Sequence, residues 1–324
     1  MGCPDWPKCF GSWVPPTKIE QLPANYKEVY TAQRVAKNKR LALTLERFGF
    51  KQVAGDIFAH PTQYIETEFN AVKTWIEYIN RLVGALIGVF IFLTVVLAFP
   101  YLRGDKTVFW LAFGAFILTG VQGWLGSLVV STNLLPVMVT IHMGLALVIV
   151  AILIYAVERS QRVRDEVAFL QAPTDYTLTG WLALAILFTF VQIVLGTQVR
   201  EQIDMIAVTD NYAHRSAWVG QLGSVFNWHR TFSVVILFIN AYVAFRLHQM
   251  QRTQLKQVAL AILSLVGIEI LAGITLAAFS LPAIVQPVHL TIGTLLFGAQ
   301  FFAFILYRQV TKSVQKVGFP QTVA

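Results

Sequence analysis

Three apolar segments of the sequence share a short polar pattern that could build a ligand site. In each, a glutamine or glutamate stands four residues before a glycine, in the pairs Gln122–Gly126, Gln192–Gly196 and Glu269–Gly273. In the first and third segments a histidine, His142 or His289, follows the glutamine or glutamate by 20 residues. Imidazole nitrogen is a ligand for iron, zinc and copper, so this recurrence indicates a metal or cofactor site.

A second pair of positions indicates that the pattern belongs to an internal duplication. Asn80 and His229 are 149 residues apart in the chain, and His142 and His289 are 147 residues apart. The near-equal offsets predict a parallel repeat of a four-helix unit, of the kind found in proteins that cross a membrane several times.

The composition places these histidines in a membrane protein. The chain has 324 residues, of which 56% are hydrophobic and 13% charged, and a formal net charge of +8. Soluble domains contain about 45–50% apolar and about 25% charged residues, so lipid must solvate most of this chain. Disorder, collagen-like repeats and disulfide-rich secreted scaffolds are excluded. The surplus of Lys and Arg reports on membrane orientation rather than on binding to nucleic acid.

Charge-free runs predict an all-α polytopic fold. A spanning helix needs about 20 apolar residues, and these runs are too long and too weakly alternating to be barrel strands. We expect two pseudo-symmetric four-helix bundles, with seven transmembrane helices at 75–99, 107–130, 136–157, 177–199, 227–247, 256–279 and 284–308. The second bundle has four of these helices and the first has three. The counterpart of helix 177–199 is therefore expected upstream of Met1.

The loops predict the orientation and the domain organisation. Lys and Arg gather in alternate loops and in the C-terminal tail, which by the positive-inside rule face the cytoplasm. The long N-terminal segment then lies outside. The expected parts are an extracytoplasmic segment 1–73, an N-terminal half bundle 74–160, a cytoplasmic linker 161–176, a C-terminal half bundle 177–310 and a cytoplasmic tail 311–324.

This topology brings the repeated positions to one depth. Asn80, His142, His229 and His289 all fall in the first two turns of helices that begin at the outer face. A histidine inside a membrane usually faces the bundle interior with a partner or ligand. Imidazoles on facing helices suit haem iron, whereas zinc or copper would call for further thiolate or carboxylate ligands. Histidines satisfied by neighbouring backbone, serine or threonine remain the alternative.

The two halves of the repeat are not equivalent. His229 and His289 form a complete pair that could hold a six-coordinate, electron-transferring haem. In the first half, His142 is matched with Asn80, which is a poor iron ligand. That half therefore leaves a coordination position open, as a reactive or exchangeable site requires.

Charged residues stand beside the repeated positions. Glu77 lies one turn before Asn80 on the same helix face and could relay protons or stabilise a cationic intermediate. Arg81 and Arg230 directly follow the axial positions and could pair with haem propionates. The alternatives are a solvated interfacial carboxylate and arginines that snorkel to the headgroups. Glu269 occupies a glutamine position, and the sequence assigns it no role.

The two cysteines of the chain are Cys3 and Cys9. In an oxidising compartment outside the membrane, so close a pair predicts a disulfide, which could be structural or redox-active. The remaining histidines, His60, His214 and His248, are expected on solvated surface.

Several motifs together resemble the haem A synthase family. They are Gly2-Cys3-Pro4-Asp5-Trp6-Pro7-Lys8-Cys9-Phe10-Gly11, Val14-Pro15-Pro16-Thr17, Trp75-Ile76-Glu77-Tyr78-Ile79-Asn80-Arg81-Leu82, Ile141-His142-Met143-Gly144, Trp228-His229-Arg230 and Val288-His289-Leu290. The match covers essentially the whole chain. It implies an eight-helix protein that oxidises a methyl group of haem O to a formyl group and so supplies haem A to a terminal oxidase.

The resemblance also implies roles for individual residues. It suggests haem b on His229 and His289 and the substrate haem O near His142, and it implicates Glu77 in the chemistry. It gives the cysteine pair a role in redox chemistry or haem delivery. The chain departs from the family in lacking a counterpart of its first helix, and in Asn80 where many members have a second histidine.

The expected setting is the inner (plasma) membrane of a cell. Expected partners are the lipid bilayer, haem O synthase, the cytochrome oxidase assembly machinery and a quinone or other electron acceptor, and a homo-oligomer is left open. Two other functions stay open: a dihaem b-type electron-transfer protein, and a haem carrier or exporter. The open first-half site and Glu77 argue against electron transfer alone. Conversion of haem O into haem A separates the enzyme from both.

Overall fold

The computed structural model describes residues 3, 5–47, 49, 51–59, 62, 68–131, 136–162, 176–250 and 252–316. Within these residues the regular structure is helical, and no β-strand forms. The α-helices are α1 (Tyr26–Arg47), α2 (Lys51–Ala59), α3 (Ala71–Ala98), α4 (Lys106–Ser131), α5 (Pro136–Arg162), α6 (Tyr176–Thr209), α7 (Ser224–His248), α8 (Thr253–Ala278) and α9 (Val285–Lys316). Short 3₁₀ helices lie at Ile19–Gln21, Phe99–Arg103, Arg215–Ala217 and Val219–Gln221.

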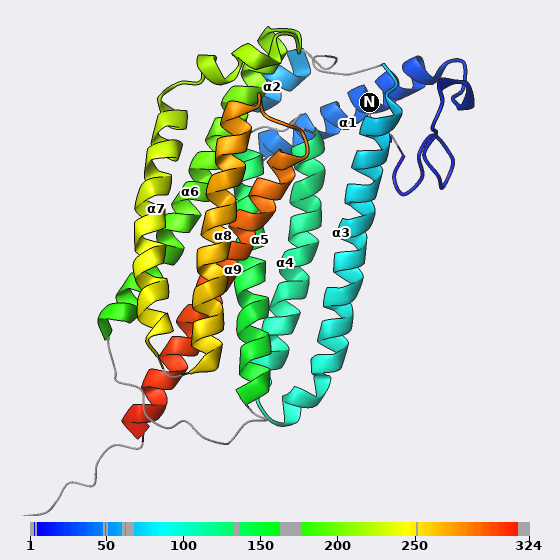
Figure 1. Cartoon of the computed structure of the whole chain (residues 1–324). Helices are drawn as coiled ribbons and strands as arrows, with labels where there is room; N and C mark the ends of the chain where they lie inside the picture. Colours follow the sequence, from blue (N-terminus) through cyan, green and yellow to red (C-terminus); the bar gives the residue numbers. More distant parts are fainter. Residues whose placement is uncertain are drawn as a thin grey trace, which may run out of the picture. The chain divides into compact units, whose positions relative to one another are not determined.

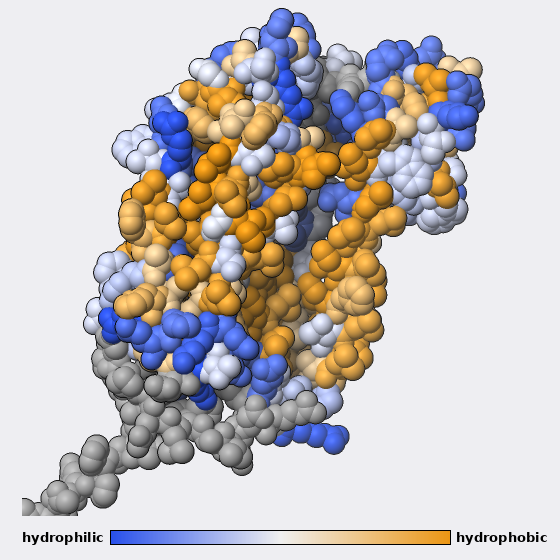
Figure 2. Space-filling model, in the orientation of Figure 1, coloured by the Kyte–Doolittle hydropathy of each residue, from blue (hydrophilic) through white to orange (hydrophobic). Residues whose placement is uncertain are grey.

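Seven of the described helices, α3 to α9, are long and apolar enough to cross a membrane. Figure 2 shows hydrophobic side chains along the middle of the helices and hydrophilic ones towards their ends. The predicted all-α polytopic membrane fold is confirmed, and each of the seven predicted spans coincides with one of these helices.

Two helices continue past the ends that the sequence predicts. α6 runs to Thr209 instead of residue 199, and α9 runs to Lys316 instead of residue 308. In the extension of α6, Arg200 and Asp204 form an ion pair across one helical turn, with Arg200 Nε 2.9 Å from Asp204 Oδ1. Charged residues with such i, i+4 spacing stabilise an exposed helix, although their charge ends a run of apolar residues.

The N-terminal segment contains two helices that the sequence analysis did not predict. Tyr26 and Tyr30 of α1 are buried together with Leu22. Further along α1, Leu41 and Leu45 pack with Ala54 of α2. The polar segment before the first span is therefore folded around small apolar clusters, and Leu128 and Met138 of the spanning helices also pack against the second of these.

Residue contacts divide the chain into two compact units. One contains residues Met1–Phe99 and Phe116–His142, and the other contains Pro100–Ala115 and Met143–Ala324. Within the second unit, α6, α7, α8 and α9 form a closed bundle in which α6 contacts α7 and α9, and α8 contacts the same two helices (Figure 1). Its apolar core includes the fully buried side chains Leu178, Leu182, Val243, Leu247, Ile262 and Tyr307.

Three buried amide and hydroxyl side chains lie inside this bundle. The Gln300 amide of α9 donates to Thr189 Oγ1 of α6 at 2.9 Å and to Asn240 Oδ1 of α7 at 2.7 Å. Asn240 in turn donates to the Ile236 carbonyl at 2.9 Å. Interhelical hydrogen bonds of this kind contribute about 0.6–2 kcal/mol each in membrane proteins, and they fix the relative rotation of the helices that they join.

The same unit has a charged contact between Asp105, which lies between two spans, and Arg159, near the end of a third span. Asp105 caps the start of α4, where its carboxylate accepts from the Thr107 N–H at 3.2 Å. Arg159 of α5 donates to both oxygens of that carboxylate, at 2.5 and 3.1 Å. The Arg159 guanidinium holds the pKa of the Asp105 carboxyl below its ordinary value of 3.8.

Replacing Asp105 by Asn should destabilise the folded protein by about 1 kcal/mol at neutral pH, because the amide keeps the helix cap but loses the bidentate ion pair. A carboxyl whose pKa is lowered by folding stabilises the fold above its unfolded pKa, and that contribution disappears as the pH falls through the folded pKa. The difference in unfolding temperature between wild type and D105N, measured in detergent, should therefore be constant above about pH 5 and shrink below about pH 4. A difference independent of pH would contradict this account.

Candidate functional site

The repeated glutamines bind the backbone of the histidine that follows them. The Gln122 amide Nε2 donates to the His142 carbonyl oxygen at 2.9 Å, and the Gln192 amide Nε2 donates to the His229 carbonyl oxygen at 2.9 Å. The first contact lies within the first unit and the second within the second unit. Both join neighbouring helices, so the sequence pattern corresponds to one structural device used twice.

The repeated glycines make room for the imidazole rings. A Cβ atom added to Gly126 would lie 3.2 Å from His142 Cε1, and one added to Gly196 would lie 3.3 Å from His229 Cε1. At Gly273 the same test gives 3.6 Å to His289 Cε1. Gly126 and Gly196 therefore let a histidine ring approach the backbone of the preceding helix, whereas at Gly273 an added Cβ would make only an ordinary van der Waals contact. We call a Gln or Glu, the glycine one turn later and the facing histidine a histidine cradle.

The third histidine cradle differs from the other two in its polar contact. Glu269 has no amide to donate, and its Oε2 lies 3.3 Å from Nδ1 of the His289 ring. Its other oxygen, Oε1, lies 3.1 Å from the point where a Cβ added to Gly293 would stand. The carboxylate thus contacts the imidazole itself rather than the backbone of its helix.

The structure brings His229 of α7 and His289 of α9 together. Their ring centroids are 6.4 Å apart and their planes are inclined by 79°. A bond from imidazole nitrogen to a metal is about 2 Å, and the ring centroid lies about 1 Å behind the nitrogen, so two axial imidazoles place their centroids about 6 Å apart. The Nδ1 atoms of both rings are buried without a hydrogen bond in the described part of the chain. The pair fits the axial ligation of one iron ion.

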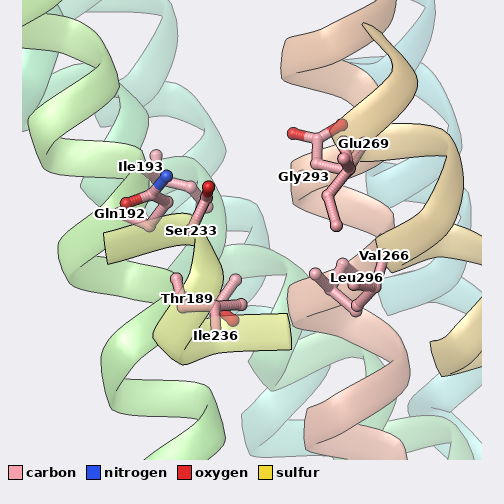
Figure 3. A pocket seen from close by; sticks show the side chains of 10 residues that line it. Thr189, Gln192, Ile193, Ser233, Ile236, Val266, Glu269, Gly293 and Leu296 are labelled. Atoms are coloured by element: carbon pink, nitrogen blue, oxygen red, sulfur yellow. The ribbon is translucent and has the colours of Figure 1, made fainter. Parts of the chain in front are cut away.

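A pocket lies beside this pair, between α6, α7, α8 and α9 (Figure 3). Its lining residues are Thr189, Gln192, Ile193, Ser233, Ile236, Val266, Glu269, Ile270, Gly293 and Leu296. Five of these ten residues are aliphatic and four are polar, a mixture that suits a site for an apolar cofactor with polar groups to orient it. The donor set and the lining therefore fit a haem.

In the first unit, the predicted disulfide between Cys3 and Cys9 is present, with the two Cα atoms 4.7 Å apart. The Asp5 carboxylate closes the same loop, because it accepts from the backbone N–H groups of Phe10 and Gly11 at 2.8 Å each. Gly11 has a φ of +80°, which favours glycine at this turn. Residues 3–13 are called the cysteine loop below.

The cysteine loop is fixed to the start of α3. The Tyr78 hydroxyl donates to the Trp13 carbonyl at 2.6 Å, and Arg81 donates to the Cys3 carbonyl at 3.3 Å. Arg81 also forms an ion pair with Glu77, one turn earlier on α3. The sequence predicts separate roles for Glu77 and Arg81, whereas the structure pairs them with each other and links Arg81 to the loop.

Other predicted site residues take no part in the contacts described above. Asn80 is exposed on α3, and Arg230 is exposed on α7 with its guanidinium 5.7 Å from the centre of the Phe226 ring. His214 and His248 are exposed, as expected for surface histidines, and His60 lies outside the described residues. Among the described residues, no three His, Cys, Asp or Glu side chains gather as a metal site.

Comparison with known proteins identifies the family. A family model described as "Cytochrome oxidase assembly protein" matches residues 51–301. Curated relatives carry the name "Heme A synthase". The chain belongs to the haem A synthase family.

The relatives differ in how much of their length the chain matches. One from Bradyrhizobium sp. (strain ORS 278) is 30% identical over 55% of this chain and 54% of its own length, so the chain spans about half of that relative. One from Rickettsia prowazekii is 23% identical over 72% of the chain and 74% of its own length. One from Shewanella oneidensis is 24% identical over 87% and 80%. No solved structure matches the chain significantly.

Replacing Gly196 by Val should destabilise the C-terminal bundle by about 1–3 kcal/mol, because the added methyl groups would overlap the His229 ring. Gly180 of the same helix is the matched control, since a Cβ there meets nothing within 4 Å. Thermal unfolding of both variants in detergent would measure the difference. Equal unfolding temperatures for G196V and G180V would show that the glycine does not hold space for the ring.

Proposed function

We propose that the protein is a haem A synthase that oxidises a methyl substituent of haem O to a formyl group, giving haem A for the assembly of a terminal oxidase. The family match supports the class of reaction. The observation that carries the proposal is the facing pair of His229 and His289 in the C-terminal bundle, whose ring centroids are 6.4 Å apart. Glu269, which contacts the His289 ring, also lines the pocket of this bundle. Oxidation of methyl to formyl, with water as the source of the oxygen atom, releases four electrons and four protons, so a carrier that passes electrons to the acceptor suits this reaction.

In this proposal the imidazoles of His229 and His289 would hold haem b. A haem held by two histidines carries one electron at a time. The chain contributes to this site by positioning His229: the Gln192 amide binds the His229 carbonyl, and Gly196 leaves space for the His229 ring. Arg230 at the exposed end of α7 is proposed to pair with a propionate of this haem.

Haem O is proposed to bind in the N-terminal half as the substrate. His142, held by Gln122 and Gly126, would bind it on one face. Asn80 would stand at the opposite position and leave it open, since an amide is a poor ligand for iron. An open position suits a substrate that must enter, react and leave.

Glu77 is proposed as the catalytic carboxylate that moves protons at this substrate site. Its ion pair with Arg81, which also binds the Cys3 carbonyl, holds the carboxylate in one orientation beside the cysteine loop. Arg81 is left with further donors for a substrate propionate, because a guanidinium has five N–H groups. The Cys3–Cys9 pair is proposed to act in redox chemistry or in delivery of haem to this substrate site.

The proposed setting is the inner membrane, with the cysteine loop outside and the C-terminus in the cytoplasm. This follows from the positions of Lys and Arg around the seven spans. Haem O synthase would supply the substrate, the oxidase assembly machinery would take the product, and a quinone or similar acceptor would take the electrons.

Cells that make this protein together with a haem O synthase should accumulate haem A, because the methyl group of haem O is then oxidised. Haem extraction followed by chromatography with mass detection would measure it, with cells that lack this protein as the control. Folded protein with His-ligated haem but only haem b and haem O in the extract would overturn the proposal. That result would favour an electron-transfer protein or a haem carrier.

Two substitutions should distinguish the role of the N-terminal half from that of the C-terminal half. E77A should abolish haem A formation and keep the low-spin haem b spectrum, because Glu77 lies in the first unit and the His pair in the second. H289A should lose the low-spin spectrum together with activity, since one axial ligand is missing. Absorption spectra of the purified variants, combined with the haem extraction assay, would test both. Normal conversion in E77A, or a retained low-spin spectrum in H289A, would refute the corresponding role.

A further inference from the structure

The three histidine cradles provide an internal comparison within one chain. In the first two, the polar residue is an amide that binds the backbone carbonyl of the histidine, at Gln122 and Gln192. In the third it is a carboxylate, Glu269, at the same distance before the cradle glycine. The amide and carboxylate side chains have nearly the same shape, so the difference between the cradles is charge and hydrogen-bonding capacity.

In the third cradle, the carboxylate of Glu269 and the imidazole of His289 each have a buried polar atom without a hydrogen bond, and the two atoms could bond to each other. Oε2 of Glu269 and Nδ1 of His289 are both buried, and neither makes a hydrogen bond to another group in the described part of the chain. They lie 3.3 Å apart. Buried polar atoms are nearly always paired, so a slight rotation of the ring that directs its N–H at the carboxylate satisfies both.

The surroundings favour this contact over others. Among the residues that line the pocket, Glu269 alone carries a formal charge, so no lysine or arginine there competes with His289 for the carboxylate. The second carboxylate oxygen lies against Gly293, where a Cβ would come within 3.1 Å. Figure 3 shows the carboxylate of Glu269 directed into the pocket, opposite Gln192 and Ser233. Gly293 therefore provides the space that the carboxylate occupies.

We propose that Glu269 is a positioning and tuning residue, which accepts the Nδ1–H of His289 and lowers the reduction potential of the haem held by His229 and His289. The proposal rests on the proposed function, because it needs a haem on this pair. A carboxylate bonded to the distal nitrogen of a ligating histidine fixes the orientation of the ring and raises its basicity as a ligand. A more basic ligand and a nearby negative charge both stabilise ferric over ferrous iron.

The second axial histidine has no such partner. Its cradle residue, Gln192, binds the backbone carbonyl, and Nδ1 of His229 is buried without a hydrogen bond in the described residues. The two axial ligands of one haem thus differ, and the tuning is assigned to the His289 side alone. A purely structural role for Glu269 would instead make it an equivalent of glutamine, with no effect on the potential.

The test is the midpoint potential of the bound haem in the purified, detergent-solubilised full chain, measured by spectroelectrochemistry at one fixed pH. E269Q places at this position the amide that the other two cradles have. We expect it to keep the low-spin spectrum and to shift the ferric–ferrous equilibrium about tenfold towards ferrous iron, which is a rise of about 59 mV for one electron. S233A is the matched control, because Ser233 lines the same pocket but donates to the Arg230 carbonyl at 2.6 Å. Its potential should stay near that of the wild type.

A second variant keeps the test decisive if E269Q does not retain haem. E269D preserves the charge but shortens the side chain by one methylene, so its carboxylate cannot reach Nδ1, and its potential should also rise. An unchanged potential in E269Q, or in E269D where E269Q is lost, would overturn the role of Glu269. An equal shift in S233A would do the same. A wild-type chain without any histidine-ligated haem would instead overturn the proposed function, which is a separate result.

Discussion

The hydrogen bond from a glutamine amide to the carbonyl of a histidine on the adjacent helix is the contact on which the arrangement of the candidate site depends. It appears at Gln122 and at Gln192, each time with a donor–acceptor distance of 2.9 Å. The contact fixes the height and rotation of the histidine helix against its neighbour, and the following glycine admits the ring. Because the bond uses backbone atoms of the histidine, it leaves both ring nitrogens available for ligand and tuning contacts.

Much of this could be predicted from the sequence, and for identifiable reasons. Long charge-free runs predict the seven spans, because lipid imposes a length and an apolarity that soluble helices lack. The pairing of His229 with His289 could be predicted from the 147-residue and 149-residue offsets, since a duplicated unit places equivalent positions at one depth. The Cys3–Cys9 disulfide could be predicted because the two cysteines lie close in sequence.

Other features depend on contacts that no pattern in a single sequence reveals. The helices α1 and α2 gain their stability from small clusters, such as Leu41 and Leu45 against Ala54, that form only once the segment folds back on itself. The ion pair of Glu77 with Arg81 has the i, i+4 spacing, but a link from Arg81 to the Cys3 carbonyl spans 78 residues and has no sequence signal. The sequence shows Glu269 at a position where the other two repeats have glutamine, but its contact with the His289 ring is seen only in the structure.

The buried amide cluster has a mechanical consequence for the C-terminal bundle. Thr189, Asn240 and Gln300 join α6, α7 and α9 by directional bonds, whereas α8 contributes no side chain to this cluster in the described residues. Apolar packing, which is non-directional, is what α8 offers at that level of the bundle, through residues such as Ile262 and Val266. The cluster therefore fixes the rotation of α6, α7 and α9 relative to one another. Among the described residues, the rotation of α8 at this level depends on the shape of its apolar side chains rather than on directional bonds.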